Sequence, residues 1–111
     1  MVVMASSPFG APTRTRVLLA LRLMASSYPR ELARLLGLAL NGVQGALRSL
    51  ERDGLVVARS VGRTRVFELN PRYFAASVLQ AYLDKLVAAD ADVQERVARL
   101  RRRPRRTGKG L

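Results

Sequence analysis

The sequence contains no cysteine, no histidine and no tryptophan, and only 8 of its residues are Asp or Glu. Without thiols or imidazoles, the chain lacks disulfides, the ordinary zinc ligands and the commonest nucleophiles and bases of enzymes. No glycine-rich phosphate loop and no well-spaced pair of carboxylates takes their place. We therefore expect a protein that is not an enzyme and that holds no cofactor and no metal.

Long apolar runs are missing as well. The apolar stretch from Met1 to Ala5 has no basic flank and is too short for a signal peptide. No later stretch approaches the roughly 20 apolar residues of a membrane span. These absences favour a cytoplasmic protein with no membrane partner, and a length of 111 residues favours one domain.

Positive charge is abundant. Lys and Arg number 20, which gives a formal net charge of +12 at pH 7. A charge of this size and sign attracts polyanions, so nucleic acid is the leading candidate partner. Charge alone also fits a basic protein without such a partner, and the pattern of residues must decide.

The first third of the chain predicts an arm and a helix. Residues 1–12 contain Pro and Gly at a density that interrupts regular structure, which indicates a flexible N-terminal arm. From Thr13, read as an N-cap, apolar residues recur at helical spacing until Ser26 and Ser27 end the pattern.

Two more helices follow in quick succession. Pro29 suits the first position of a short second helix, and Gly37 suits the left-handed residue that ends it. Apolar residues with helical spacing then predict a third helix over about 40–53, closed by Gly54.

A β-hairpin is expected next. Residues 55–59 and 65–69 are strand-like runs around the five-residue loop 60–64, and Asn70-Pro71 stops the second run. The remainder is helical up to a basic tail.

The C-terminal region 73–103 shows a heptad-like apolar seam, interrupted by Asp90. Asp92 with Glu95 resembles a capping box, so one bent helix or two short ones both fit. The seam favours a homodimer, although it could instead pack on its own domain. The predicted dimer residues are Leu79, Leu83, Leu86, Val93, Val97 and Leu100.

This order of elements is the winged helix-turn-helix plan. Residues 9–14, 28–33, 50–56 and 62–65 resemble the winged-helix domains of the ArsR and MarR class of bacterial regulators, and the stretch Leu50 to Val56 is the most telling. The resemblance covers roughly residues 9–74 and implies a dimeric transcriptional regulator. Metal-sensing members use Cys or His clusters, which this chain lacks.

The predicted fold is mainly α with a small β-hairpin (α+β). It consists of the arm at 1–12, a winged helix-turn-helix domain at 13–72, a C-terminal dimerisation helix or helices at 73–103, and a basic tail at 104–111 that could add non-specific affinity for nucleic acid.

The third helix is the predicted recognition helix, with its polar side toward double-stranded DNA. Asn41 and Gln44 would read base edges, Arg48 a guanine edge or a phosphate, and Arg52 a phosphate. Gly42 and Gly45 each cost roughly 1 kcal/mol relative to Ala, and close approach to a duplex would explain them, although they could be tolerated accidents. The predicted contacts on this helix are Asn41, Gln44, Gly45, Arg48, Ser49 and Arg52.

Further cations are candidates for the DNA backbone. The wing supplies Arg59, Arg63, Thr64 and Arg65, which would lie against phosphates or in the minor groove. Arg14, Arg16, Arg30 and Arg34 are additional phosphate candidates.

Two weaker sites remain. Tyr28, Phe74 and Tyr82 could line a ligand cavity, although aromatics at helical spacing are more often core, and no effector can be named. Asp84, Asp90, Asp92 and Glu95 offer oxygen ligands, but such residues more simply cap and solvate helices.

The function predicted from the sequence is a DNA-binding transcriptional regulator that acts as a homodimer. Repression is the default sense, since a dimer on a promoter blocks polymerase by occupancy. The alternative is a winged-helix protein-interaction or RNA-binding module that works with a partner protein.

Overall fold

The computed structural model describes residues 9–102. Most of the predicted N-terminal arm and the whole predicted tail lie outside the described residues. Five helices and a three-stranded antiparallel sheet make up the described part, which confirms the predicted α+β fold class. The elements are α1 Pro12–Met24, β1 Ser26–Ser27, α2 Pro29–Leu36, α3 Leu40–Arg52, β2 Val56–Val61, β3 Thr64–Leu69, α4 Ala76–Ala88 and α5 Ala91–Arg102.

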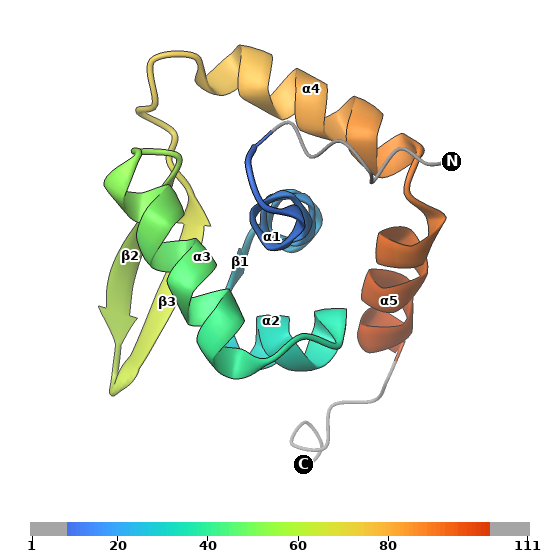
Figure 1. The fold of residues 1–111 in the computed structure, drawn as a ribbon, viewed down its shortest axis with the longest axis horizontal. Helices are drawn as coiled ribbons and strands as arrows, with labels where there is room; N and C mark the ends of the chain where they lie inside the picture. The colour runs from blue at the N-terminus through green and yellow to red at the C-terminus, as the bar shows by residue number, and fades with distance from the viewer. Residues whose placement is uncertain (1–8, 103–111) are drawn as a thin grey trace.

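Helix α1 is the centre of the molecule, and Figure 1 shows it end-on with the other helices arranged around it. Its five consecutive residues Val17 to Leu21 are all buried. A helix that is apolar on every side must be covered on every side, so α1 organises one shared core. The helix begins one residue before the predicted cap: Pro12 is at its first turn, Ala11 precedes it, and Thr13 lies inside it.

Helices α2 and α3 form the helix-turn-helix. Pro29 is at the first turn of α2, and Gly37 ends it in the left-handed conformation with φ of 68°. The Leu38 N–H then donates to the Ala33 carbonyl at 3.0 Å, which closes the helix end. Both predicted helices are confirmed with bounds within a residue or so of those expected.

The sheet differs from the predicted hairpin in two ways. Strands β2 and β3 pair as far as Val61 and Thr64, so the turn contains only Gly62 and Arg63 instead of five residues. Gly62 has a φ of 63°, which a tight hairpin turn requires and glycine adopts without strain. In addition, Ser26 and Ser27, read as a helix stop, form strand β1 on the other edge of β3.

The C-terminal region is two helices, not one bent helix. Asp90 lies between the two helices and is the N-cap of α5, because its Oδ1 accepts a hydrogen bond from the Val93 N–H at 3.0 Å. Asp92, the predicted cap, lies inside α5 instead. The residue that interrupted the heptad seam therefore marks the helix boundary.

The predicted dimer seam is a core element of its own chain, which corrects the expectation. Leu79, Leu83, Val93 and Val97 are buried in the shared core, and Leu86 packs against it while partly exposed. Leu100, also partly exposed, lines a hollow against α2. The buried part of this side of α4 and α5 covers α1 and is not exposed to a second chain.

Candidate nucleic-acid interface

The outer side of α3 presents the polar residues that the sequence placed there. Asn41, Gln44 and Arg48 are exposed, while Val43, Ala46, Leu47 and Leu50 on the opposite side are buried. Among residues 9–102, nothing accepts a hydrogen bond from Arg48 and no carboxylate pairs with it. Its guanidinium is therefore available to an outside partner.

The two glycines of α3 serve no packing need within residues 9–102. A Cβ added to Gly42 would meet nothing within 4 Å among the described residues, and one added to Gly45 would meet only the Arg48 guanidinium at 3.9 Å. Each glycine lowers helix stability by roughly 1 kcal/mol relative to Ala. Because glycine has no side chain, the backbone of α3 is uncovered between Asn41 and Arg48, where an outside partner can approach it.

The C-terminal end of α3 is held by internal contacts. Ser49 accepts a hydrogen bond from Arg14 and lies 3.4 Å from a nitrogen of Arg52. Arg52 also lies 3.5 Å from Asp53. Ser49 and Arg52, two of the residues predicted to contact DNA, therefore also make contacts within the chain. Arg52 is the more exposed of the two.

Arg14 is a positioning residue, which the sequence did not indicate. Its side chain is only 18% exposed and pairs with Asp53 at 3.1 Å. It also donates to the Phe9 carbonyl and to the Ser49 hydroxyl. These contacts tie the start of α1 to the end of α3, so this guanidinium is not free for a phosphate.

On the hairpin, Arg59, Arg63 and Thr64 are exposed at or near the tip. Neither arginine has an acidic partner or a hydrogen-bond acceptor within the described part of the chain. Arg65 is different, since it pairs with Glu51 of α3 at 3.0 Å and lies over the Phe67 ring at 5.4 Å. Arg65 therefore fixes the hairpin to α3.

Asn70 fixes the base of the hairpin in the same way. Its side-chain nitrogen donates to the Gly54 carbonyl at 2.9 Å, and its side-chain oxygen accepts from the Arg72 N–H at 2.9 Å. Its backbone N–H donates to the Leu55 carbonyl. The end of α3 and the end of β3 are thus one rigid corner, which sets the angle between helix and wing.

The four arginines predicted to contact the DNA backbone differ in their ion pairs according to the helix that carries them. Arg30 and Arg34 on α2 are exposed and carry no internal ion pair among residues 9–102. Arg16 on α1, by contrast, binds Asp92 of α5 at 2.7 Å. Only the two on α2 keep the free guanidinium that a phosphate contact needs.

On the side of α4 and α5, acidic residues pair with most of the arginines. Arg22 binds Asp84 of α4 at 2.7 Å, and this contact raises the pKa of Arg22 and lowers the pKa of Asp84. Hydrogen bonds from Arg96, followed by the charge of Arg16, lower the pKa of Asp92. Glu95 lies beside Arg99 and Arg102, at 3.5 and 3.7 Å.

The unpaired cations are therefore concentrated on one side. Within residues 9–102, three cations outside α2, α3 and the wing also lack a side-chain partner: Arg72, which follows β3 and was missed from the sequence, Lys85 on α4, and Arg101 on α5, which donates to the Leu23 carbonyl. The unpaired arginines of α2, α3 and the wing are Arg30, Arg34, Arg48, Arg59 and Arg63.

The predicted aromatic cavity does not form. Tyr28 lines a hollow between α2 and α5, whereas Phe74 and Tyr82 lie on or beside α4, where Tyr82 contacts Phe9. Phe74 is 92% exposed, Val78 68% and Tyr82 44%, and they follow one another at intervals of four residues. The fold thus shows that Val78 faces outward.

The scattered carboxylates have other roles. Asp84 and Asp92 bind arginines, Asp90 caps α5, and Glu95 faces Arg99. In the described range no three Asp or Glu side chains cluster as a metal site would require. None of the helices between residues 9 and 102 is long and apolar enough to cross a bilayer.

Comparison with known proteins places this arrangement in a family. No family model and no curated protein matches the sequence. The structure is similar to ZitR of Lactococcus lactis, with a TM-score of 0.56, 16% identity, and coverage of 81% of this chain and 69% of that one. A ZitR mutant in complex with DNA matches with a TM-score of 0.57 and 16% identity, over 80% of this chain and 64% of that one.

At such identities the ZitR matches show the fold, and this chain spans about two thirds of the ZitR chains. A third structure is more similar in sequence. It is a protein described as a possible transcriptional regulator for arsenical resistance, with 30% identity and a TM-score of 0.51, and the match covers 71% of this chain and 88% of that one. With the helix-turn-helix, the hairpin and this relative in place, the chain belongs to the winged-helix transcriptional regulators of the ArsR/MarR type, a family of regulators and not of enzymes.

Proposed function

We propose that this protein binds duplex DNA through α3 and the hairpin and represses transcription from the sites it occupies. The observation that carries the proposal is the concentration of unpaired arginines on α2, α3 and the wing, while within residues 9–102 every arginine of α1 and α5 except Arg101 meets a carboxylate. Free guanidinium groups displace counterions from the phosphate backbone and so supply affinity. A ZitR structure that contains DNA gives the same fold a precedent.

In this proposal α3 enters a major groove. Asn41 and Gln44, near its N-terminus, read base edges, and Arg48 reaches a guanine edge or a phosphate one turn further on. The low surface at Gly42 and Gly45 lets the helix backbone approach the duplex. Arg52 contributes a phosphate contact at the end of the helix, where its guanidinium also contacts Ser49.

The wing and α2 hold the phosphates on either side of that groove. Arg59, Arg63 and Thr64 lie at the hairpin, which the Arg65–Glu51 pair and the Asn70 corner keep at a fixed angle to α3. Arg30 and Arg34 supply the flanking contacts on α2. These contacts give position and affinity, whereas α3 gives sequence preference.

We further propose that the regulator is a homodimer, and that the outer side of α4 is its interface in place of the buried seam. Phe74, Val78 and Tyr82 form an exposed apolar stripe there. Figure 1 shows α4 on the opposite side of α1 from α2, so a partner on α4 leaves α2 uncovered. Exposed apolar stripes of this kind mark interaction surfaces.

Charge favours a second copy of the chain as the partner on this stripe. Two copies of a chain with a net charge of +12 repel each other over most of their surfaces. Residues 73–89 are an exception, since Asp84 and Lys85 are their only charged residues and Arg22 binds Asp84. A two-fold axis here would present two recognition helices to DNA half-sites roughly 34 Å apart.

Binding to the duplex upstream of the protein's own coding region, compared with a scrambled duplex, tests the DNA proposal. We expect the native duplex to bind about a thousandfold more tightly at a fixed salt concentration. Repression is then read from a reporter gene placed behind that duplex. Equal, salt-sensitive binding to both duplexes would contradict the regulator proposal and favour the protein-interaction or RNA-binding module.

Light scattering after size exclusion tests the dimer. Val78→Asp places a charge on the stripe and should convert a dimer to a monomer. Val61→Asp is the matched control, because Val61 on the hairpin is also an exposed valine, at 49%. A dimer that persists in Val78→Asp, or a monomeric wild type, would contradict the α4 interface.

A further inference from the structure

A small apolar surface interrupts the polar side of the molecule at the turn between α2 and α3 (Figure 1). Leu38 and Leu40 are half-buried, and Ala39 between them is exposed. The two leucines line a shallow hollow together with Ala33, and their inner parts pack against the core. The base and phosphate contacts proposed for α2 and α3 make no use of these apolar side chains.

The backbone holds this apolar surface in one position. Gly37 is left-handed, and the Leu38 N–H donates to the Ala33 carbonyl at 3.0 Å, so the turn is fixed. Ala39 is the N-cap of α3 and makes no side-chain hydrogen bond to the first turn. Ser, Thr, Asp or Asn at this position would stabilise the helix more. As with the two glycines of α3, helix stability is lower than it could be on the side that faces the proposed duplex.

The charges beside this surface restrict what can bind there. Arg30 and Arg34 line the same hollow, and neither meets a carboxylate or another acceptor among residues 9–102. A fitting partner therefore brings negative charge to the edges of the hollow and an apolar group to its middle. Duplex DNA does both, because phosphates border its major groove and the C5-methyl group of thymine projects into that groove.

We propose that Leu40, with Ala39 beside it, contacts the C5-methyl group of a thymine, and that the affinity for duplex DNA depends on this methyl group. The inference rests on the proposed DNA-binding function and specifies one base that the protein recognises. Leu40 is the first residue of α3 and precedes Asn41, which is proposed to read a base edge. Leu38 lies beneath the methyl group, while the two arginines of α2 hold the neighbouring phosphates.

Replacement of thymine by uracil tests this contact, because uracil lacks the C5-methyl group and keeps the base pair. Each thymine of the duplex upstream of the coding region is replaced in turn, and fluorescence anisotropy of the labelled duplex measures its affinity for the full chain at one salt concentration. We expect a loss of about fourfold at the thymine that each α3 contacts, the effect of exposing one methyl-sized group, and no change at the others.

The variant Leu40→Ala assigns the contact to its residue. It should bind the unmodified duplex about fourfold more weakly than wild type, and uracil at the sensitive position should cause no further loss, since the two changes remove the same contact. The comparison of thymine with uracil uses one protein at a time. A change in the folded fraction therefore leaves this ratio unaltered.

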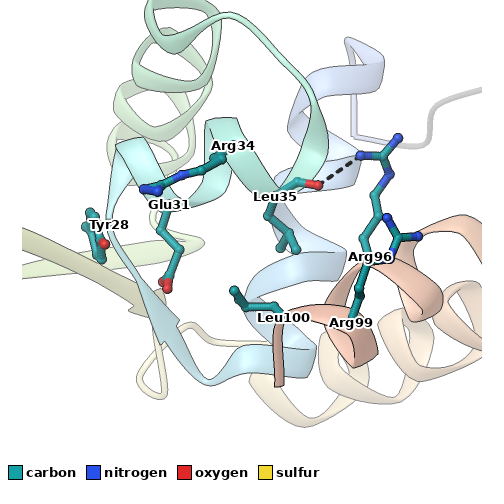
Figure 2. A pocket seen from close by; sticks show the side chains of 7 residues that line it. All are labelled: Tyr28, Glu31, Arg34, Leu35, Arg96, Arg99 and Leu100. Carbon is teal, nitrogen blue, oxygen red and sulfur yellow. Dashed lines mark hydrogen bonds between the residues drawn. The ribbon is translucent and has the colours of Figure 1, made fainter. Parts of the chain in front are cut away.

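Leu35→Ala is the matched control. Leu35 is also a half-buried leucine that packs against the core, but Figure 2 shows it on the other side of α2, toward Leu100 of α5. This variant should keep the full fourfold discrimination between thymine and uracil.

Two results would overturn the inference and leave the DNA-binding function intact: a wild type that is insensitive to uracil at every thymine, or a Leu40→Ala variant that keeps the wild-type discrimination. Equal binding of the native and scrambled duplexes by wild type, before any uracil is introduced, would overturn the inference and the proposed function together.

Discussion

Arginines on the two sides of α1 differ in whether they have a carboxylate partner. On the side of α4 and α5, Arg16, Arg22 and Arg96 each meet a carboxylate within 3 Å. On the side of α2, α3 and the hairpin, Arg30, Arg48 and Arg63 meet no partner in the described residues. Unpaired like charges on one surface lower the stability of the protein alone, so their concentration there indicates an outside polyanion.

The two sides also differ in their exposed apolar residues. The α4 side carries the exposed stripe of Phe74, Val78 and Tyr82, and only two charged residues lie in 73–89. The α3 side is polar and cationic. One side therefore suits a second copy of the chain and the other suits a polyanion, and the following substitutions test this division.

The largest expected effect separates the core seam from the exposed stripe on the same helix. Leu83→Ala removes a fully buried side chain of α4 and should lower the free energy of unfolding by about 3 kcal/mol. Val78→Ala, on the outer side, should change it by less than about 0.5 kcal/mol in dilute protein. Urea denaturation measures both. A large loss in Val78→Ala with a small loss in Leu83→Ala would reverse our assignment of the two faces.

A second comparison concerns two arginines on opposite sides. Arg48→Ala should weaken binding to the native duplex about 10- to 100-fold, because one base-edge or phosphate contact is lost. Arg22→Ala should leave that affinity nearly unchanged, since Arg22 binds Asp84 on the α4 side. Fluorescence anisotropy with labelled duplex measures both. Equal effects of the two substitutions would show that only total charge matters.

The glycines of α3 allow stability and binding to be separated. Gly42→Ala should raise the free energy of unfolding by about 1 kcal/mol, because the added Cβ meets no described residue within 4 Å and Ala favours the helix. The same substitution should weaken DNA binding about tenfold if the backbone approaches the duplex there. A more stable variant with unchanged DNA affinity would mean that close approach does not occur at Gly42.

The smallest expected effect is the loss of stability at low pH that follows from protonation of the paired carboxylates Asp84 and Asp92. The pKa values of Asp84 and Asp92 are lowered from an ordinary 3.8, so their pairs stabilise the fold above that pH and are lost as pH falls through the lowered values. We expect the melting temperature to be steady from pH 8 to about 5 and to fall below about 4. The double variant Asp84→Asn, Asp92→Asn should show a shallower fall. An equally steep fall would assign the acid response to other carboxylates.

The sequence predicted the helix-turn-helix well because its signals are local. Pro29 and Gly37 fix the ends of α2 through their own backbone preferences, and the apolar spacing of α3 fixes its buried side. The outward position of Asn41, Gln44 and Arg48 follows from the same spacing. A hairpin was also evident, but its turn was placed too wide, because Val61 and Thr64, which are β-branched and favour strands, were included in the loop.

The features that the sequence missed depend on contacts between distant residues. Strand β1 exists because Ser26 and Ser27 meet Glu68 and Phe67, which lie some forty residues away. The role of Arg14 depends on Asp53, and the use of the α4–α5 seam as core depends on the burial of α1. Spacing showed that the seam would be covered, but it could not show whether the cover was the same chain or a second one.

The most direct test of the account is the salt dependence of DNA binding in two triple variants. One replaces Arg30, Arg48 and Arg63 by Gln, and the other replaces the paired Arg16, Arg22 and Arg99 by Gln. Each phosphate contact contributes roughly 0.9 to the slope of log affinity against log salt concentration. We predict that the first variant loses about two to three units of slope and the second keeps nearly the wild-type slope. Equal losses in the two variants would contradict the account, because the unpaired arginines would then have no special role at the DNA.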